Sequence, residues 1–390
     1  MDDLTRLIHH PYRAPAGFDA VPPAVHKASS VLFPSVAALR ARDWRSKAGY
    51  TYGLHGTPTT FTLEQRIASL EGARHCVLAP SGLAALALVN LALLREGDEL
   101  LLPDNAYGPA KDLARGLLAR WGIAHRVYDP LDAAALDAMV GPRTRLLWVE
   151  AAGSVTLEFP DLRGLVRVAR RHGLSVALDN TWGAGLAFKP FDLGEGLAVD
   201  LSVHALTKYP SGGADVLMGA VSTTDAALHE RLLLAHMQLG LGVGANDAEA
   251  VLRGLPSLAL RYDAQDAAAR RLAAWAQQQP GIARVLHPAL PGAPGHAHWA
   301  AHCTRAAGLC SLLFDAAVAS QRVDAFVDAL RLFRIGYSWG GPVSLAVPYD
   351  LTPMRQDRSR LPGTLVRLAI GLEAVDDLQA DLAQALAGLS

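Results

Sequence analysis

Short apolar runs recur between residues 75 and 223, and segments long enough for a helix separate them. The runs are HCVLAP (75–80), DELLLPD (98–104), AHRVYDP (124–130), TRLLWVEAA (144–152), LSVALDN (174–180), DLSVHAL (200–206) and LMGAVST (217–223). Runs this short, alternating with helical segments, are typical of βαβ units. The pattern therefore predicts an α/β fold built around a mostly parallel sheet.

A helical stretch rich in Ala, Leu and Arg follows, from Ala248 to Pro280, and we expect it to link two domains. Beyond it, the pattern predicts strands at 283–288, 308–315 and 364–373 and a helix at 322–333, which together favour a smaller α+β domain. Residues 1–55 carry scattered Pro and aromatic residues without a period, as in an extended arm. The expected division is an arm (1–55), a large domain (56–250) and a carboxyl-terminal domain (251–390).

The composition excludes some classes of protein. The 390 residues are 51% hydrophobic and 19% charged, which indicates a globular protein with a large core. The net charge of -1 gives no basic face, so nucleic acid is not an expected partner. Three cysteines without C-x-x-C spacing and an amino terminus unlike a secretory signal favour the cytoplasm. Polar breaks in the longest apolar stretch, 75–94, argue against a membrane span.

Two residues indicate the chemistry. Lys208 lies in the apolar context SVHALTKYPSGG, where desolvation lowers an amine's pKa and makes it a nucleophile towards carbonyls. Asp179 ends an apolar run 29 positions earlier, where the carboxyl end of a parallel strand meets the ligand crevice. Alone, a lysine is more often a surface residue, and an aspartate at this position is equally well explained by a turn. Together they are the pair that pyridoxal phosphate requires, one for its carbonyl and one for its ring nitrogen.

Four further positions fit the same cofactor. Gly82 and Leu83, in APSGLAAL, would present main-chain N–H groups at a helix amino terminus, which suits a phosphate, and the Thr207 hydroxyl could join them. Tyr107 follows a predicted strand and could stack on a planar ring, although ordinary packing explains it equally well. In the carboxyl-terminal part, Arg367 alternates with apolar residues and would suit a substrate carboxylate or an internal acid.

Two other patterns carry less weight. The glycines of GLGVGAND (240–247) resemble a dinucleotide motif but follow a helical segment instead of a strand. His287, His296, His298 and His302 lie among Pro and Gly residues, which predicts an irregular loop without the spacing of metal ligands. No metal site is expected.

The sequence resembles the Cys/Met-metabolism family of pyridoxal-phosphate enzymes from about Tyr52 to its carboxyl end. The motifs are GTPTTFTLEQRIASLEGA, PSGLAAL, NAYGP, LDNTWGAG, TKYPSGGADVLMG, HPALPG followed by GHAHW, YSWGGPVSL and LVRLAIGLE. The resemblance implies the aspartate-aminotransferase-like fold (fold type I), with a seven-stranded sheet, a smaller carboxyl-terminal domain and a homotetramer of catalytic dimers. It also implies carbon–sulfur lyase activity, with cystathionine as the expected substrate and homocysteine, pyruvate and ammonia as products.

The resemblance assigns a role to each site residue. Lys208 would hold the cofactor covalently and then act as base, Asp179 would pair with the ring nitrogen, and Tyr107 would stack. The remaining cofactor contacts are Gly82, Leu83, Thr207, Ser154 and, across a subunit boundary, Tyr52; the substrate contacts are Arg367, Ser338, Trp339 and Tyr337. Relatives that act at Cγ usually carry a glutamate in place of Tyr337, so this position favours β-elimination.

Two positions depart from the family pattern. The arm motif Tyr-x-Arg, whose arginine reaches a neighbouring subunit's phosphate, reads Tyr52-Gly53-Leu54 here. A serine two residues before the threonine is replaced by Ala205. The phosphate would then depend on a protonated His55, or on the main-chain amides and Thr207.

Two alternatives stay open at this point. One is γ-elimination or γ-replacement on the same scaffold. The other is a regulatory protein that keeps the cofactor and acts by binding a partner. The intact set of Lys208, Asp179 and Arg367 favours an enzyme, because a binding protein has little use for all three.

Overall fold

The structure is a computed structural model. It describes residues 20–352, 354–355 and 361–388, together with Thr5, Ile8, Ala16 and Gly17. Most of the first 19 residues of the expected arm therefore lie outside the described residues. None of the described helices is long and apolar enough to cross a membrane.

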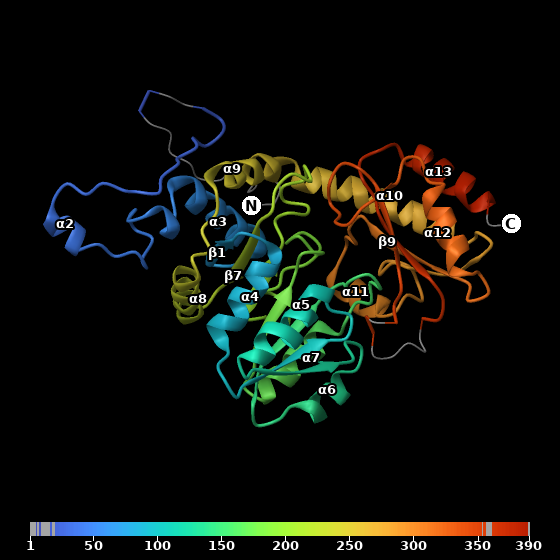
Figure 1. Cartoon of the computed structure of the whole chain (residues 1–390), viewed down its shortest axis with the longest axis horizontal. Helices are drawn as coiled ribbons and strands as arrows, with labels where there is room; N and C mark the ends of the chain where they lie inside the picture. Colours follow the sequence, from blue (N-terminus) through green and yellow to red (C-terminus); the bar gives the residue numbers. More distant parts are fainter. Residues whose placement is uncertain are drawn as a thin grey trace.

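A seven-stranded sheet forms the centre of the amino-terminal part (Figure 1). Its strands are β1 (His75–Ala79), β2 (Glu99–Pro103), β3 (Ala124–Tyr128), β4 (Thr144–Glu150), β5 (Ser175–Asp179), β6 (Leu201–His204) and β7 (Gly219–Thr223). The order is β1-β7-β6-β5-β4-β2-β3, and only β7 runs antiparallel to its neighbours. All seven predicted runs form strands, and the mostly parallel sheet is confirmed.

Helices cover both faces of this sheet. They are α3 (Pro58–Glu71), α4 (Gly82–Leu93), α5 (Gly108–Leu113), α6 (Ala133–Met139), α7 (Leu162–Arg171) and α8 (Ala226–Leu239), with a π-helical segment at Ala114–Leu118. Alternate strand residues supply two separate cores, because successive side chains point to opposite faces. On β1, for example, Leu78 packs with Leu63 of α3, whereas Val77 packs with Leu86 of α4.

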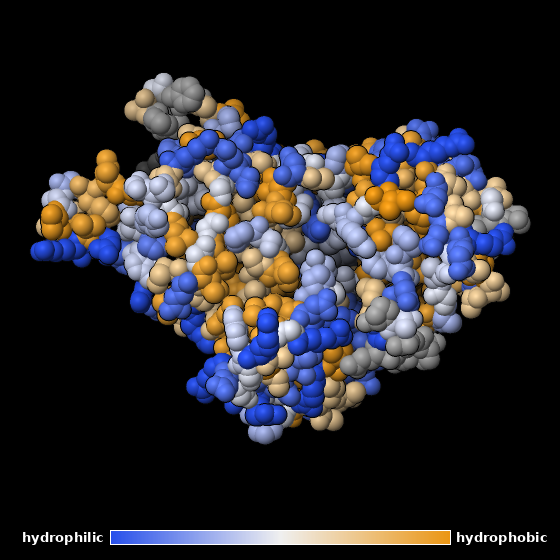
Figure 2. Space-filling model, viewed as in Figure 1, coloured by the Kyte–Doolittle hydropathy of each residue, from blue (hydrophilic) through white to orange (hydrophobic). Residues whose placement is uncertain are grey.

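The described part of the arm projects away from the body, with the short helix α2 (Val36–Arg40) at its far end (Figure 1). Ser30 and Tyr52 form an isolated antiparallel bridge at its base, beside a 3-10 turn at Gly53–His55. Apolar side chains gather on this projection in Figure 2. In the described arm, Leu32 and Val36 are 93% and 60% exposed. The described arm has no extensive hydrophobic core of its own.

The linking helix is broken, which corrects the prediction of one helix from Ala248 to Pro280. The structure has α9 (Ala245–Gly254), a 3-10 turn (Leu255–Ser257) and α10 (Leu258–Ala276). Pro256 lacks an N–H for an α-helical bond. Gly254 lies against the main chain, and a Cβ there would be 2.2 Å from the Pro210 carbonyl oxygen. The close approach and the proline together explain the break.

A second, five-stranded sheet forms the carboxyl-terminal part, in the order β10-β11-β12-β9-β8. Its elements are β8 (Ile282–Leu286), α11 (His296–His302), β9 (Leu309–Phe314), α12 (Ser320–Asp328), β10 (Arg334–Ile335), β11 (Leu345–Tyr349), β12 (Leu365–Ala369) and α13 (Val375–Ala387). The helix predicted at 322–333 ends at Asp328 instead. Strand β11 was not predicted because it contains Pro348. The strand tolerates this proline because Pro348 lies beyond the two residues of β11 that pair with β10.

The histidine-rich segment is also more regular than predicted, because His296–His302 is a helix. His287 lies outside it, fully buried, and its Nδ1 accepts a hydrogen bond from the Ala289 N–H at 3.2 Å. Within the described ranges, no group of three or more His, Cys, Asp or Glu side chains is arranged to hold a metal ion. All three cysteines are free and buried.

Candidate active site

A cavity of about 700 Å³ lies where the carboxyl ends of β4, β5 and β6 meet residues of the second sheet. Every predicted site residue except Tyr52 lines it. These residues are Gly82, Leu83, Tyr107, Ser154, Asp179, Thr207, Lys208, Tyr337, Ser338, Trp339 and Arg367. Segments more than 280 positions apart therefore converge on one enclosed space.

Lys208 follows β6 in a tight turn, and its amine lies inside the cavity. Nζ donates a hydrogen bond to Ser338 Oγ at 2.8 Å and lies 5.6 Å from the centre of the Trp339 ring. Burial, helped by the positive charge of Arg367, lowers the pKa of Lys208 to about 8. The neutral amine, the form that acts as nucleophile or base, is thus accessible near neutral pH.

Asp179 ends β5 beneath the same cavity. Its Oδ1 accepts hydrogen bonds from the Thr181 N–H at 3.0 Å and the Thr181 hydroxyl at 2.5 Å. Burial nevertheless raises the pKa of Asp179. A carboxylate in this position gains most from a cationic N–H partner, since such a partner offsets the cost of burying the charge.

The amino terminus of α4 closes another side of the cavity. Ser81 caps the helix by accepting from the Ala84 N–H, and none of the described residues accepts from the Gly82 and Leu83 N–H groups. A Cβ on Gly82 would lie 2.7 Å from the Ala205 Cβ, so only glycine fits here. The two free donors at a helix amino terminus form a site for an anion.

Arg367 projects from β12 and is only 7% exposed, yet no described acidic side chain pairs with it. Nη2 donates to the Ser338 carbonyl oxygen at 3.2 Å, and the buried Nε has no acceptor. Burial lowers the pKa of Arg367 below that of a free guanidinium. A buried cation with unused donors is suited to a carboxylate ligand.

Ser338 joins the two cations of the site. Its hydroxyl accepts from Lys208 and its carbonyl from Arg367, and its backbone φ of 98° lies in the region that favours glycine. Non-glycine residues hold such a conformation only where their surroundings impose it, and these cases cluster at functional sites. Trp339, one residue on, packs edge to face against Tyr209, with ring centres 5.4 Å apart.

The groups that line the cavity agree with the comparisons between this chain and known proteins. It matches the family model described as "Cys/Met metabolism PLP-dependent enzyme" over residues 4–387. The chain belongs to this family.

Individual relatives span most of the chain. It is 42% identical to the cystathionine β-lyase of Bordetella avium, covering 92% of this chain and 90% of that protein, and 36% identical to the cystathionine β-lyase of Escherichia coli K12, covering 93% and 92%. Among solved structures, the cystathionine γ-synthase of Xanthomonas oryzae pv. oryzae superposes with a TM-score of 0.90 at 29% identity, covering 100% of this chain and 98% of that one. The likeness confirms fold type I.

Membership of the Cys/Met-metabolism family implies pyridoxal 5'-phosphate as cofactor, and the cavity suits it. A lysine amine of lowered pKa, a buried carboxylate and two free N–H groups at a helix start occupy three separate walls. These are the kinds of group that the cofactor's carbonyl, ring nitrogen and phosphate require. The Thr207 hydroxyl fits less directly, since it already donates to the Met218 carbonyl oxygen and accepts from the Met218 N–H.

Two predicted contacts, Tyr107 and Ser154, line the cavity near β4. The Tyr107 N–H donates to Glu150 Oε2 at 2.7 Å, and the residue is 43% exposed. The Ser154 N–H donates to the Asn105 carbonyl oxygen, so its main chain is fixed at the cavity wall. Their cofactor contacts remain predictions.

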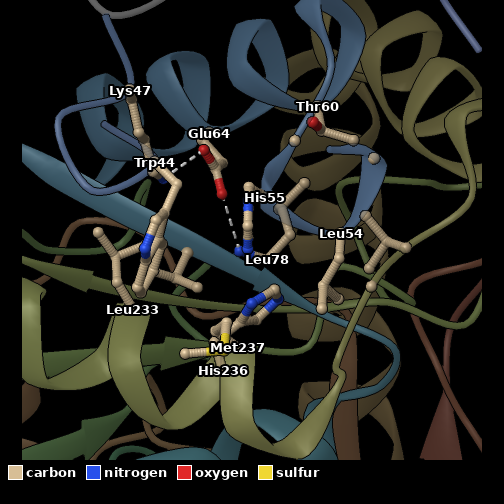
Figure 3. Close-up of a pocket in the computed structure, with 15 residues that line it drawn as sticks. Trp44, Lys47, Leu54, His55, Thr60, Glu64, Leu78, Leu233, His236 and Met237 are labelled. Carbon is tan, nitrogen blue, oxygen red and sulfur yellow. Dashed lines mark hydrogen bonds and ion pairs between the residues drawn. The ribbon is translucent and has the colours of Figure 1, made fainter. Parts of the chain in front are cut away.

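Tyr52 lies on the arm, outside the cavity, and is 50% exposed. Its neighbour Leu54 points into a separate small cavity of about 30 Å³ between the arm, α3 and α8 (Figure 3). His55 stacks on Trp44 there, with ring centres 4.9 Å apart, and its Nδ1 lies 2.9 Å from the Thr51 hydroxyl. Burial lowers the pKa of His55, which argues against the protonated histidine considered as a phosphate ligand.

Several lining residues were not predicted, and three of them carry polar or adaptable side chains at the site, namely Glu150, Tyr349 and Met354. Glu150 ends β4 directly beside Asp179 in the sheet, and burial next to that acid raises its pKa strongly. It carries the same signal as Asp179, an acid closing an apolar run. Tyr349 and Met354 also line the cavity, from β11 and the loop after it. No local pattern marks them, because only the pairing of β11 with β12 brings them to the site.

The packing of Gly82 against Ala205 makes a prediction. Gly82→Ala places two methyl groups about 2.7 Å apart, so the start of α4 must shift. We expect the dissociation constant for pyridoxal phosphate to rise about tenfold, as overpacking commonly costs this much. Equilibrium titration of the cofactor-free protein measures it. Gly116→Ala, which meets no atom within 4 Å, is the control.

A second substitution separates the clash from a general loss of folding. Adding Ala205→Gly to Gly82→Ala removes the opposing methyl group and should restore most of the affinity. Unchanged affinity in Gly82→Ala would show that the amides of α4 do not hold the phosphate.

Proposed function

We propose that the protein is a cystathionine β-lyase, which cleaves the Cβ–Sγ bond of cystathionine and of other cysteine S-conjugates. The observation that carries the proposal is the Lys208 amine, whose pKa is about 8, in the same cavity as the Arg367 guanidinium, which pairs with no acid among the described residues. One group can remove a proton while the other fixes the carboxylate next to that carbon. The β-lyase relatives at 36–42% identity support the choice of reaction.

Several residues would hold the cofactor. Lys208 would bind its carbonyl carbon, Asp179 would accept from its ring nitrogen, and the amides of Gly82 and Leu83 would bind its phosphate. Tyr107 would stack on the ring. When bound, pyridoxal phosphate supplies an electron sink for the charge that develops at the substrate Cα.

The chain's own groups then carry the proton chemistry. Arg367 binds the substrate carboxylate, with Ser338 fixing the guanidinium through its carbonyl oxygen. Lys208 Nζ, released as a neutral amine, takes the Cα proton as general base. The sulfur departs with the electron pair of the Cβ–Sγ bond and is protonated to homocysteine. Water hydrolyses the three-carbon fragment to pyruvate and ammonia, so one water is consumed per cystathionine.

The arm leads us to infer a catalytic dimer. Tyr52 is absent from its own chain's cavity, and the arm bearing it projects outward with exposed apolar side chains (Figure 2). The cavity mouth carries matching exposed side chains, Leu83, Leu217 and Tyr337. An arm from a second copy would cover both surfaces, and two such dimers would form the homotetramer.

We further infer a cytoplasmic role in methionine biosynthesis, in which the homocysteine product is methylated. The proposed units remain the arm at 1–55, the cofactor-binding domain at 56–250 and the carboxyl-terminal domain at 251–390. Each unit holds one of the groups just described, namely Tyr52, Lys208 and Arg367.

The keto acid product tests the reaction. The holoenzyme should convert L-cystathionine into pyruvate and homocysteine in equal amounts, measured by chromatography of both products. A second candidate, γ-elimination or γ-replacement, is favoured by the superposition on a cystathionine γ-synthase. Formation of 2-oxobutyrate and cysteine, with no pyruvate, would replace the β-lyase proposal by this one.

A further inference from the structure

Tyr349 lies beside Arg367 on the neighbouring strand of the second sheet. Strands β11 and β12 pair antiparallel, with Val347 opposite Arg367 and Tyr349 opposite Leu365. Tyr349 and Arg367 are therefore diagonal neighbours on the same face of the sheet, within reach of each other. Both side chains line the cavity.

The tyrosine ring lies against the guanidinium. Arg367 Cζ is 5.4 Å from the centre of the Tyr349 ring, within the range of a cation–π interaction. The Tyr349 hydroxyl also interacts with the guanidinium, and the Ser338 carbonyl oxygen accepts a hydrogen bond from Nη2. Arg367 thus meets an aromatic face where most buried arginines meet a carboxylate.

The group that contacts Arg367 determines whether its guanidinium can still bind a ligand carboxylate. A carboxylate partner would neutralise Arg367 and occupy two of its N–H donors in bidentate pairing. The face of an aromatic ring attracts the same cation. It does not accept hydrogen bonds from the N–H donors in the plane of the guanidinium. Arg367 is consequently held in place while its charge and its buried Nε remain available to a ligand.

We propose that Tyr349 is a positioning residue that presents the Arg367 guanidinium to the α-carboxylate of the substrate. The inference rests on the proposed function, in which Arg367 is the carboxylate-binding group. It predicts that the aromatic ring contributes more to carboxylate binding than the phenolic hydroxyl, which also interacts with Arg367.

Two substitutions separate the ring from the hydroxyl. Tyr349→Phe keeps the aromatic face, and Tyr349→Leu replaces it with an aliphatic chain that still fills the wall. The dissociation constant of the holoenzyme for L-alanine, an amino acid without a leaving group, is measured by calorimetry, with L-alaninamide as the ligand lacking a carboxylate. Tyr349→Leu should weaken L-alanine binding about tenfold, the loss of a desolvated cation–π contact. Tyr349→Phe keeps the ring and loses the interaction of the hydroxyl with Arg367, so it should weaken L-alanine binding less than Tyr349→Leu does.

The amide tests specificity for the carboxylate. L-Alaninamide should bind the parent and Tyr349→Leu equally, because it makes no ion pair with Arg367. In an Arg367→Ala background, adding Tyr349→Leu should cause no further loss, since the two residues act through one contact. Steady-state kinetics should show the change in KM with kcat within about twofold.

Other results would overturn the proposal. Equal weakening by Tyr349→Phe and Tyr349→Leu would assign the effect to the hydroxyl, and equal weakening for acid and amide would assign it to general packing. Unchanged L-alanine binding in Tyr349→Leu would remove Tyr349 from carboxylate recognition. Because L-alanine binding needs no turnover, each of these results is independent of whether pyruvate or 2-oxobutyrate is the product.

Discussion

Lys208→Ala should lower pyruvate release from cystathionine by at least about 10³-fold, because one side chain supplies both the covalent anchor and the base. The parent amine is suited to both tasks by its pKa of about 8 and its contact with Ser338. Alanine offers neither. The measurement is single-turnover pyruvate formation at saturating cofactor, with the visible absorbance of the bound cofactor followed in the same samples.

Two controls sharpen this result. Lys189→Ala removes another partly buried lysine, one that donates to the Leu70 and Gly185 carbonyl oxygens and is not among the residues that line the cavity. It should leave pyruvate formation per bound cofactor within about twofold, since surface and packing changes away from a site rarely alter chemistry. Added ethylamine should partly restore turnover to Lys208→Ala by serving as an external base. Full turnover in Lys208→Ala without added amine would eliminate Lys208 as the base.

Arg367→Ala should raise the KM for cystathionine about 100-fold, the scale expected when a buried charge-assisted pair loses one partner. The guanidinium has no acid of its own among the described residues, so the ligand carboxylate would be its main ionic partner. Arg367→Lys should have a KM between those of the parent and Arg367→Ala, because lysine keeps the positive charge and loses the planar set of N–H donors. Steady-state kinetics with each variant gives KM and kcat separately.

The exposed Arg253 provides the matched control for Arg367. It pairs with Glu249 on the surface of α9, and Arg253→Ala should leave KM unchanged. An unchanged KM in Arg367→Ala would contradict its role as the carboxylate ligand. It would also remove the basis for the Tyr349 proposal. Unchanged binding of L-alanine by Arg367→Ala would then confirm that the Tyr349 proposal is wrong.

Local sequence patterns predicted the large sheet and its two central groups well. Each strand from β1 to β7 is a short apolar run, and Asp179 and Lys208 are marked by their positions at the end of such runs. Glu150 carries the same mark, an acid that closes an apolar run, although it was not predicted. The carboxyl-terminal part was predicted less fully, since β11 contains a proline and α9 and α10 are separated by the contact at Gly254.

The remaining site features depend on contacts that no short segment contains. The cation–π contact of Tyr349 needs the register of β11 and β12, and the Lys208–Ser338 hydrogen bond joins residues 130 positions apart. The fit of Gly82 against Ala205 likewise joins α4 to the turn after β6. Ala205 departs from the family pattern, and its methyl group now has a defined place against the helix that would bind the phosphate.

Exchange of the Cα proton of L-alanine tests the central claim most directly. In D₂O, the holoenzyme should replace this proton with deuterium, seen as loss of the Cα–H signal by NMR, because Arg367 holds the carboxylate while Lys208 removes the proton. The Lys208→Ala holoenzyme should bind L-alanine and leave the signal intact. Equal exchange by both proteins, or no exchange by the parent, would contradict the assignment of Lys208 as the base in this cavity.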